Sequence, residues 1–600
     1  MHDSLGQRAA GSGQRAAGSG QRAAGSGQRA AGSGQRAAGS AVPSAGRQQA
    51  VLVAVRSAGA LHRLLDVLPV FDGDERIAVR FTLVPGSAFD VDALAALERS
   101  GARTVGWDEA RGTRHDLILT ASTKGALRVL SGPRVVLPHG AGYNKTVGGD
   151  GSPHLPSGLD PHYLLADGEP WATLHALAHD DQLTRLGTHC PAAAARATVV
   201  GDPTLDRLLG SLAHREDYRS ALGTGGRRLV VLTSTWGPES LLARRPELPG
   251  ELVARLPHDA YQLALVLHPN EHSRIGTFDL TRHLAPALTA GLVLAGPYEE
   301  WAALLVAADA VVTDHGSTAL YAAALGRPLI GAYDGGSELI PGSPMDRLLA
   351  RVPRLAEPSG LESALDAAAA QETRGFADAA FALPGRCLPR LRQELYRLLG
   401  LRPRAVPVAP RALPRPAAVP RRPAALAVRA EVDGRRIRVT RFPPYAPGGA
   451  HHLSAEHPEA GPRQTQSAAV LWRRARPASG APHSSTWTAA GWTARVLDDF
   501  PFCTVAAAVL TPERCLVRHR LAGLFSLRIE PDRTGGRILR ADPACVLSAV
   551  HAWLAATPRP PSTAPLTTLT SLTSLVCDTG PVAVRFELRP AEESDLGYEL

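Results

Sequence analysis

Hydrophobic positions between residues 50 and 195 alternate between two patterns. Runs such as AVLVAV (50–55) and DLILTAS (116–122) have the length of short buried strands. Segments with helical spacing lie between such runs, including LHRLLDVLPVF (61–71) and VDALAALERSG (91–101). Short β-rich runs that alternate with helices of about ten residues predict βαβ units and a parallel sheet.

A second series of the same kind begins at ATVVGDP (197–203). Its strand-like runs are 227–236, 262–270, 291–297, 309–317 and 327–334, and its helical segments are 249–257, 298–309 and 317–326. This pattern predicts a second doubly wound domain. Two such domains in tandem place a cleft between the carboxyl ends of their strands.

The N-terminal segment is a repeat. Residues 6–40 are five copies of GQRAAGS, which lacks the Leu or Ile that a coiled-coil seam needs and carries Gly and Ser that disfavour a helix. We therefore expect residues 1–46 to be a disordered tail. A second interpretation is a weak tether to an anionic surface through the repeated arginines: Arg8, Arg15, Arg22, Arg29 and Arg36.

The C-terminal third differs from the two predicted domains in its composition and in its pattern of predicted elements. Seven prolines and five arginines between 403 and 424 indicate a semi-rigid linker. A hairpin is expected over 426–442, with its turn at Asp433-Gly434. The sequence thus predicts an α/β protein with domains at 47–197 and 198–400, a linker at 401–425 and an α+β accessory domain at 426–600, in which we find no catalytic constellation.

Charge and cysteine content narrow the class of protein. The net charge is +5 over 1–50 and +10 over 401–600, whereas 51–400 carries −6. A nucleic-acid binder should be basic on its organised domains, so this distribution argues against one. The six cysteines form no CxxC pair, and no uncharged apolar run reaches the length of a membrane helix. The first residues are polar and Arg-bearing, so we expect no signal peptide there. We expect a cytoplasmic protein without a metal site.

The segment 298–334 carries the strongest chemical signal. A buried strand over 310–313 ends in Asp314-His315-Gly316, and a helix starts at Ser317-Thr318. Free backbone N–H groups and small hydroxyl side chains at such a helix start suit a phosphate group. The alternative interpretation is that Ser317 only caps the helix.

This segment resembles the donor-binding motif of the CDP-glycerol glycerophosphotransferase family. The matching residues are Tyr298, Thr313, Asp314, Ser317, Gly326 and Pro328. Further resemblances follow the order of the family's motifs: His139-Gly140 with Lys145, Gly201-Asp202-Pro203 with Asp206, Thr235-Trp236, and His268-Pro269. This sequence departs from the family at His315 and Gly316, where the family has Tyr and Ser, and at Tyr321, where it usually has a carboxylate.

The resemblance implies a GT-B architecture and a transferase of cell-envelope polymer synthesis. Its donor would be a nucleoside diphosphate linked to glycerol or a sugar, and its acceptor a hydroxyl group, often lipid-linked. The resemblance places His139 as general base and His268 with Ser317 and Thr318 at the departing phosphate. Thr235, Lys145, His315 and Gly316 complete the expected nucleotide and phosphate site, and the scheme needs no metal or cofactor.

Other interpretations stay open at this point. One is a nucleotide-sugar glycosyltransferase or epimerase-like enzyme on the same scaffold, and another is a non-catalytic nucleotide-binding protein. The basic flanks suit peripheral contact with the inner face of a membrane, although an arginine-rich composition alone would also produce them. The H-x-x-E-H match at 268–272 is rejected as a zinc site because its first His closes a strand, and neither Lys124 nor Lys145 lies in a Walker A motif.

Overall fold

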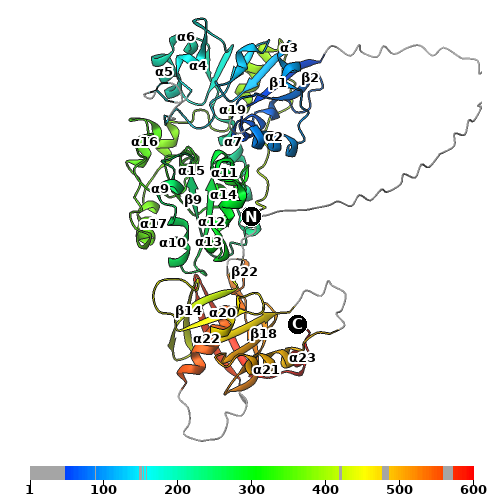
Figure 1. Ribbon diagram of the computed structural model, residues 1–600, viewed down its shortest axis with the longest axis vertical. Coiled ribbons are helices and arrows are strands. Elements are labelled where there is room, and N and C mark those ends of the chain that lie inside the picture. Colours follow the sequence, from blue (N-terminus) through cyan, green and yellow to red (C-terminus); the bar gives the residue numbers. More distant parts are fainter. Residues whose placement is uncertain are drawn as a thin grey trace, which may run out of the picture. The chain divides into compact units, whose positions relative to one another are not determined.

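The computed structural model describes residues 48–600 except 88–89, 147–151, 153–154, 157, 418–421, 476–484, 535 and 558–571. The tail expected at 1–46 lies outside this described part. Within it, the chain forms two α/β domains, each built on its own parallel sheet, and a β-barrel (Figure 1). No helix in the described residues is both long and apolar enough to span a membrane.

The first domain is built on a six-stranded sheet in the order β2-β1-β3-β4-β7-β8, and every strand pair in it is parallel. Its strands are β1 (Gln49–Val55), β2 (Ile77–Leu83), β3 (Leu117–Thr120), β4 (Arg134–Val136), β7 (Leu174–Leu177) and β8 (Ala197–Val199). Its helices are α1 (Ala58–Leu65), α2 (Asp90–Arg99), α3 (Trp107–Gly112), α4 (Pro161–Leu164), α5 (Asp180–His189) and α6 (Pro191–Ala194). Two short strands, β5 (Leu165–Ala166) and β6 (Glu169–Pro170), pair antiparallel outside the main sheet. The helical segment expected at 61–71 is α1 followed by a 3-10 turn over Leu68–Phe71, because Pro69 cannot continue the helix.

The second domain has a five-stranded parallel sheet in the order β11-β10-β9-β12-β13. Its strands are β9 (Arg228–Ser234), β10 (Tyr261–Leu267), β11 (Val293–Leu294), β12 (Ala310–Thr313) and β13 (Leu329–Gly331). Its helices are α7 (Pro203–Gly210), α8 (Arg215–Ala221), α9 (Leu241–Arg244), α10 (Leu248–Arg255), α11 (Pro269–Ile275), α12 (Thr277–His283), α13 (Ala285–Thr289), α14 (Glu300–Ala307), α15 (Thr318–Ala324), α16 (Pro344–Leu349), α17 (Leu361–Ala369) and α18 (Arg374–Asp378). Separate hydrophobic clusters cover the two faces of this sheet, as a doubly wound fold requires.

One strand lies in the other sheet from the one expected. The run 197–203 was expected to open the second domain, but β8 pairs in parallel with β7 and belongs to the first sheet. The expected boundary at 198 therefore falls inside β8, and the second sheet begins at β9. A run of three residues carries too little pattern to show which sheet it joins.

The chain returns to the first domain at α19 (Cys387–Leu398). Leu388, Leu391 and Leu395 on one face of α19 lie in the hydrophobic core of the first domain, and Figure 1 shows α19 among the elements of that domain. The chain crosses between the domains twice, after β8 and before α19, and these two segments contact each other at Gly201, which has a φ of +89°. A β-carbon there would lie 2.9 Å from the carbonyl oxygen of Ala382, so both the backbone conformation and the space require glycine.

The proline-rich segment after α19 packs against both α/β domains. Arg411 pairs with Asp72 of the first domain, and Tyr218 of the second donates a hydrogen bond to the carbonyl of Leu413. Leu413 is itself buried, and its backbone N–H is bonded to Ser211. The described part of the expected linker therefore follows a fixed path.

The C-terminal part is a closed barrel in the order β14-β15-β23-β24-β20-β19-β18-β17-β16. Its strands are β14 (Ala425–Asp433), β15 (Arg436–Phe442), β16 (His452–Glu456), β17 (Val470–Arg474), β18 (Val505–Thr511), β19 (Arg514–His519), β20 (Gly523–Ile529), β23 (Thr573–Thr579) and β24 (Val582–Pro590), and a ribbon pairs β21 (Asp532–Thr534) with β22 (Arg537–Leu539). Its helices are α20 (Pro462–Ser467), α21 (Ala489–Asp499), α22 (Pro543–Ala556) and α23 (Glu593–Leu596). The buried Arg441 of β15 forms ion pairs with Asp542 and with Asp259 of the second domain. The sequence predicted the β14–β15 hairpin but not the closure of the strands into a barrel.

Candidate functional site

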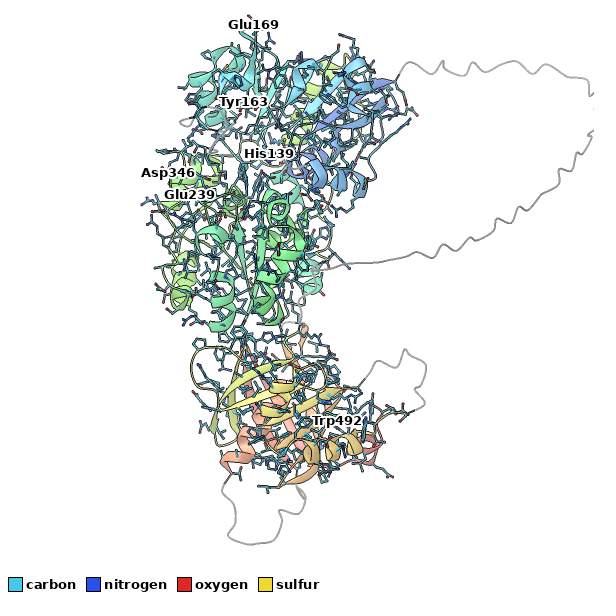
Figure 2. The ribbon with its side chains drawn as sticks, viewed as in Figure 1. His139, Tyr163, Glu169, Glu239, Asp346 and Trp492 are labelled. Atoms are coloured by element: carbon cyan, nitrogen blue, oxygen red, sulfur yellow. The ribbon has the colours of Figure 1, made fainter. Side chains whose placement is uncertain are left out.

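A cavity of about 590 Å³ is lined by residues of both α/β domains. Residues that follow β1, β3 and β4 line it from the first domain, and residues that follow β9, β10 and β12 line it from the second. Figure 2 shows His139 at the edge of the first domain that faces the second. All eight residues that the sequence nominated line this cavity: His139, Lys145, Thr235, His268, His315, Gly316, Ser317 and Thr318.

His139 follows β4 and is open to the cavity, although protein atoms of both domains surround it. The ring of His139 packs against α1. Its Cε1 lies only 3.3 Å from the position that a β-carbon on Gly59 would occupy. The surrounding protein, and then the positive charge of Arg63, lower the pKa of His139, while a hydrogen bond to the backbone of Ala121 opposes this shift. A pKa below the ordinary 6.5 leaves the imidazole neutral at neutral pH, so it can accept a proton.

His268 follows β10 and caps α11. The backbone N–H of Asn270 donates to Nδ1 of His268 over 3.1 Å, so Nδ1 carries no proton. Burial, followed by the electrostatic influence of His139 and Lys145, holds the pKa of His268 well below its usual value. The proton of the neutral ring is consequently on Nε2, which makes this nitrogen a hydrogen-bond donor.

Asp314 holds the turn between β12 and α15 in place. Its buried carboxylate accepts hydrogen bonds from the backbone N–H groups of Thr235, Leu241 and Gly316, at 2.7 to 2.8 Å. Burial raises the pKa of Asp314, and these three N–H groups counteract the rise. Asp314 thus fixes the strand ends of β9 and β12 relative to each other and does not itself line the cavity.

Glycine at position 316 has a steric reason. A β-carbon on Gly316 would lie 3.0 Å from Oδ1 of Asp314 and 3.2 Å from Cβ of Thr235. The serine that the resembling family carries here would therefore be crowded by its neighbours in this chain.

Ser317 lines the cavity from the second domain and lies close to a loop of the first. A β-carbon on Gly140 would lie 3.1 Å from Oγ of Ser317, which shows how closely the loop after β4 approaches α15. Ser317 is the residue before α15, yet its hydroxyl makes no capping hydrogen bond to the helix. The interpretation of Ser317 as a simple cap is therefore wrong.

Lys145 and His315 meet at one carboxylate. Oε2 of Glu338 lies 3.0 Å from Nε2 of His315 and 3.4 Å from Nζ of Lys145. Nδ1 of His315 also lies 2.9 Å from the hydroxyl of Tyr333, so both nitrogens of this buried ring have partners within the protein. Burial alone would raise the pKa of Glu338, but His315 and Lys145 outweigh it and lower that pKa. His315 lines the cavity, but both of its ring nitrogens are engaged by protein groups, which hold the ring in place.

The same segments join the two domains by backbone hydrogen bonds. The N–H of Thr146 donates to the carbonyl of Glu338, and the N–H of Ile340 donates to the carbonyl of Asn144. An antiparallel bridge between Lys145 and Leu339 lies between these two bonds.

Tyr321 occupies the position at which the resembling family usually has an acid. Its hydroxyl donates to Oδ2 of Asp202 over 3.1 Å. The guanidinium of Arg63 pairs with both oxygens of Asp202, at 2.6 and 2.7 Å, and all three side chains are buried. Asp202 also caps α7 through the N–H of Leu205, so the Gly-x-Pro motif region has a structural role here.

Sequence reasoning missed several residues of this cavity. Arg56 and Arg63 were not nominated, although Arg56 directly follows the first apolar run. Lys124 was considered only for a Walker A motif, and its rarity was the available signal, since Lys124 and Lys145 are the two lysines of the chain. Glu338 does not itself line the cavity but contacts Lys145 and His315, and it carried no signal because Lys145 is remote from it in sequence.

Comparisons with family models and with curated proteins gave no match. Solved structures similar to this chain include the wall teichoic acid polymerase TagF. The TagF structure soaked with CDPG is 13% identical, with a TM-score of 0.42, covering 59% of this chain and 88% of TagF. The UDP-GlcNAc 2-epimerase of Neisseria meningitidis is 12% identical with a TM-score of 0.39, covering 58% and 99%, and S. aureus MnaA with UDP is 10% identical with a TM-score of 0.41, covering 59% and 98%.

The cavity offers acid–base chemistry and hydrogen-bond donors. A neutral imidazole lines one wall, and an Nε2–H donor and a hydroxyl without a capping bond line the other. Among the described residues, no three His, Cys, Asp or Glu side chains are grouped so that they could hold a metal ion.

Proposed function

We propose that this protein is a transferase that moves a glycerol-phosphate or glycosyl group from a nucleoside diphosphate donor to a hydroxyl acceptor, in the synthesis of a cell-envelope polymer. The observation that carries the proposal is that motif residues from both sheets line a single cavity, with His139 on one wall and His268 and Ser317 on the other. The motif resemblance supplies the kind of donor.

In this proposal His139 is the general base. It accepts the proton of the acceptor hydroxyl as that oxygen attacks the donor. A low pKa keeps the imidazole unprotonated, which this role requires. Negative charge develops on the phosphate oxygens of the departing nucleotide. These oxygens accept hydrogen bonds from Nε2–H of His268 and from the hydroxyl of Ser317.

Thr235, Gly316 and Thr318 line the same wall as Ser317, and we assign them to the nucleotide phosphates. Lys145 supplies a positive charge at the edge of this wall, while His315 positions the turn and, through Glu338, Lys145.

A non-catalytic nucleotide-binding protein is the second candidate, because Tyr321 is engaged by Asp202 and replaces the family's acid. A thermal-shift screen with CMP, CDP-glycerol, UDP and UDP-sugars separates the outcomes. A nucleotide that binds the folded state raises its melting temperature in proportion to RT ln(1 + [L]/Kd). Binding together with turnover of a donor supports the transferase, binding without turnover of any donor supports the second candidate, and no shift with any nucleotide contradicts both.

A further inference from the structure

The first-domain wall of the cavity carries two cationic side chains that the proposed donor site does not use. Arg56 follows β1 and Lys124 follows β3, and both line the cavity and are half-buried. Because β1 and β3 are adjacent parallel strands, their carboxyl ends bring the two residues to the same edge of the sheet.

The backbone is shaped to hold the two cations together. A β-carbon on Gly125, the residue after Lys124, would lie only 2.8 Å from a terminal nitrogen of Arg56. The other terminal nitrogen of Arg56 donates to the carbonyl of Gly86, in the loop after β2. The guanidinium therefore rests directly on the backbone that follows Lys124. Burial, and then the charge of Arg56, lower the pKa of Lys124 to about 8.

Hydroxyl groups lie beside these cations. Oγ of Ser57 accepts a hydrogen bond from the N–H of Ala60, and Oγ of Ser122 accepts one from the N–H of Lys124. Since each oxygen is engaged as an acceptor from the backbone, its own O–H is available as a donor. Both serines line the cavity.

We propose that Arg56 and Lys124, with Ser57 and Ser122, form an anion subsite that holds a phosphate group of the acceptor. The inference rests on the proposed function and adds to it the chemical class of the acceptor. Like charges brought together in a partly desolvated site repel each other, and a bound anion relieves this repulsion. Guanidinium, ammonium and hydroxyl donors together suit the several oxygens of a phosphate.

The position of His139 limits where the reacting hydroxyl lies on this acceptor. Ala121, whose backbone bonds to His139, directly precedes Ser122 and lies three positions before Lys124 in the loop after β3, and all four residues line the cavity. The hydroxyl that reaches the base and the phosphate that reaches Lys124 therefore belong to one small unit, as in a glycerol or sugar phosphate. An acceptor of this size without a negative charge lacks the second contact.

The experiment measures binding of glycerol 3-phosphate by calorimetry, with glycerol as the uncharged probe and with saturating CMP as a second arm. We expect glycerol 3-phosphate to bind the parent protein, to bind R56Q and K124Q about 10- to 100-fold more weakly, and to bind R56K at an intermediate level. The matched control R111Q changes an exposed arginine of α3, whose partner is Asp108, and should bind like the parent. Melting temperatures identify any variant that is misfolded, and the milder R56K then carries the comparison.

Equal binding of glycerol 3-phosphate to the parent, R56Q and K124Q would overturn the subsite, as would no binding to the parent. Simple competition between glycerol 3-phosphate and CMP would overturn the assignment to the acceptor, because the anion would then occupy the donor's phosphate site. The donor site and the acceptor subsite are tested separately. If R56Q and K124Q still bind CMP, the donor site is supported whatever the result for the subsite. If the parent protein binds no nucleotide, but R56Q and K124Q both lose the binding of glycerol 3-phosphate, the subsite is supported and the proposed donor site is contradicted.

Discussion

Arg63 of α1 and Asp202 at the start of α7 form a buried two-bonded ion pair, with N–O distances of 2.6 and 2.7 Å. The pair joins the first domain to the chain that enters the second, and the hydroxyl of Tyr321 completes it from α15. The acid that the resembling family carries at this helical position would here face the carboxylate of Asp202.

Substitution at Tyr321 tests this arrangement. We expect Tyr321→Phe to lower the free energy of unfolding by about 0.5–1.5 kcal/mol, the value of one neutral hydrogen bond. Tyr321→Glu should lower it by about 3–5 kcal/mol, because it places a second buried carboxylate beside Asp202. Urea denaturation of both variants measures the difference, and a Tyr321→Glu protein as stable as Tyr321→Phe would contradict the role of the pair.

Replacing His139 should separate chemistry from binding. His139→Ala is expected to lower turnover by roughly 10²–10⁴-fold while the affinity for nucleotide is retained, because a general base acts only as the acceptor loses its proton. Single-turnover rates and nucleotide titrations measure the two effects. A loss of nucleotide affinity as large as the loss of rate would place His139 at the donor instead.

The pH profile should carry the signature of a lowered histidine pKa. A base must be unprotonated, and a pKa below the ordinary 6.5 keeps His139 in that form as the pH falls through 6.5. We therefore expect kcat/KM to retain more than half of its plateau value at pH 6.5 and to decline only at lower pH. A decline centred above pH 6.5 would indicate another base.

Ser317 should affect affinity rather than chemistry. Ser317→Ala is expected to weaken nucleotide binding by about 0.5–1.5 kcal/mol, and by more if the hydrogen bond to phosphate is charge-assisted. Because the hydroxyl makes no capping bond to α15, the melting temperature should not change. A fall in stability without a change in affinity would return Ser317 to a structural role.

Position 316 tests the steric argument for glycine. Gly316→Ser should destabilise the protein by about 1–3 kcal/mol, since its β-carbon meets Asp314 and Thr235 at 3.0 and 3.2 Å. Gly360→Ser is the matched control, because a β-carbon at Gly360 meets no atom within 4 Å. Equal melting temperatures for the two variants would show that the turn adapts without cost.

The parts of the site that the sequence predicted share one property: they follow strands that are readable as apolar runs. His139, His268 and Ser317 could be placed at strand ends in this way, and two facing parallel sheets bring strand ends together. The parts that it did not predict depend on partners remote in sequence. The contact of Glu338 with Lys145 spans 193 positions, and that of Arg63 with Asp202 spans 139. The three-residue strand β8 was misplaced for the same reason, because its sheet is decided by pairing and not by its own pattern.

Because α19 packs into the first domain, that domain is built from two separate stretches of the chain. Leu388, Leu391 and Leu395 lie in the core of a domain whose strands are all encoded before residue 200. A fragment that ends near residue 200 would contain every strand of the first sheet, yet expose the apolar surface that these leucines cover. The first α/β domain is thus discontinuous in the gene, and a coding fragment that is to yield it in folded form must also supply the residues of α19.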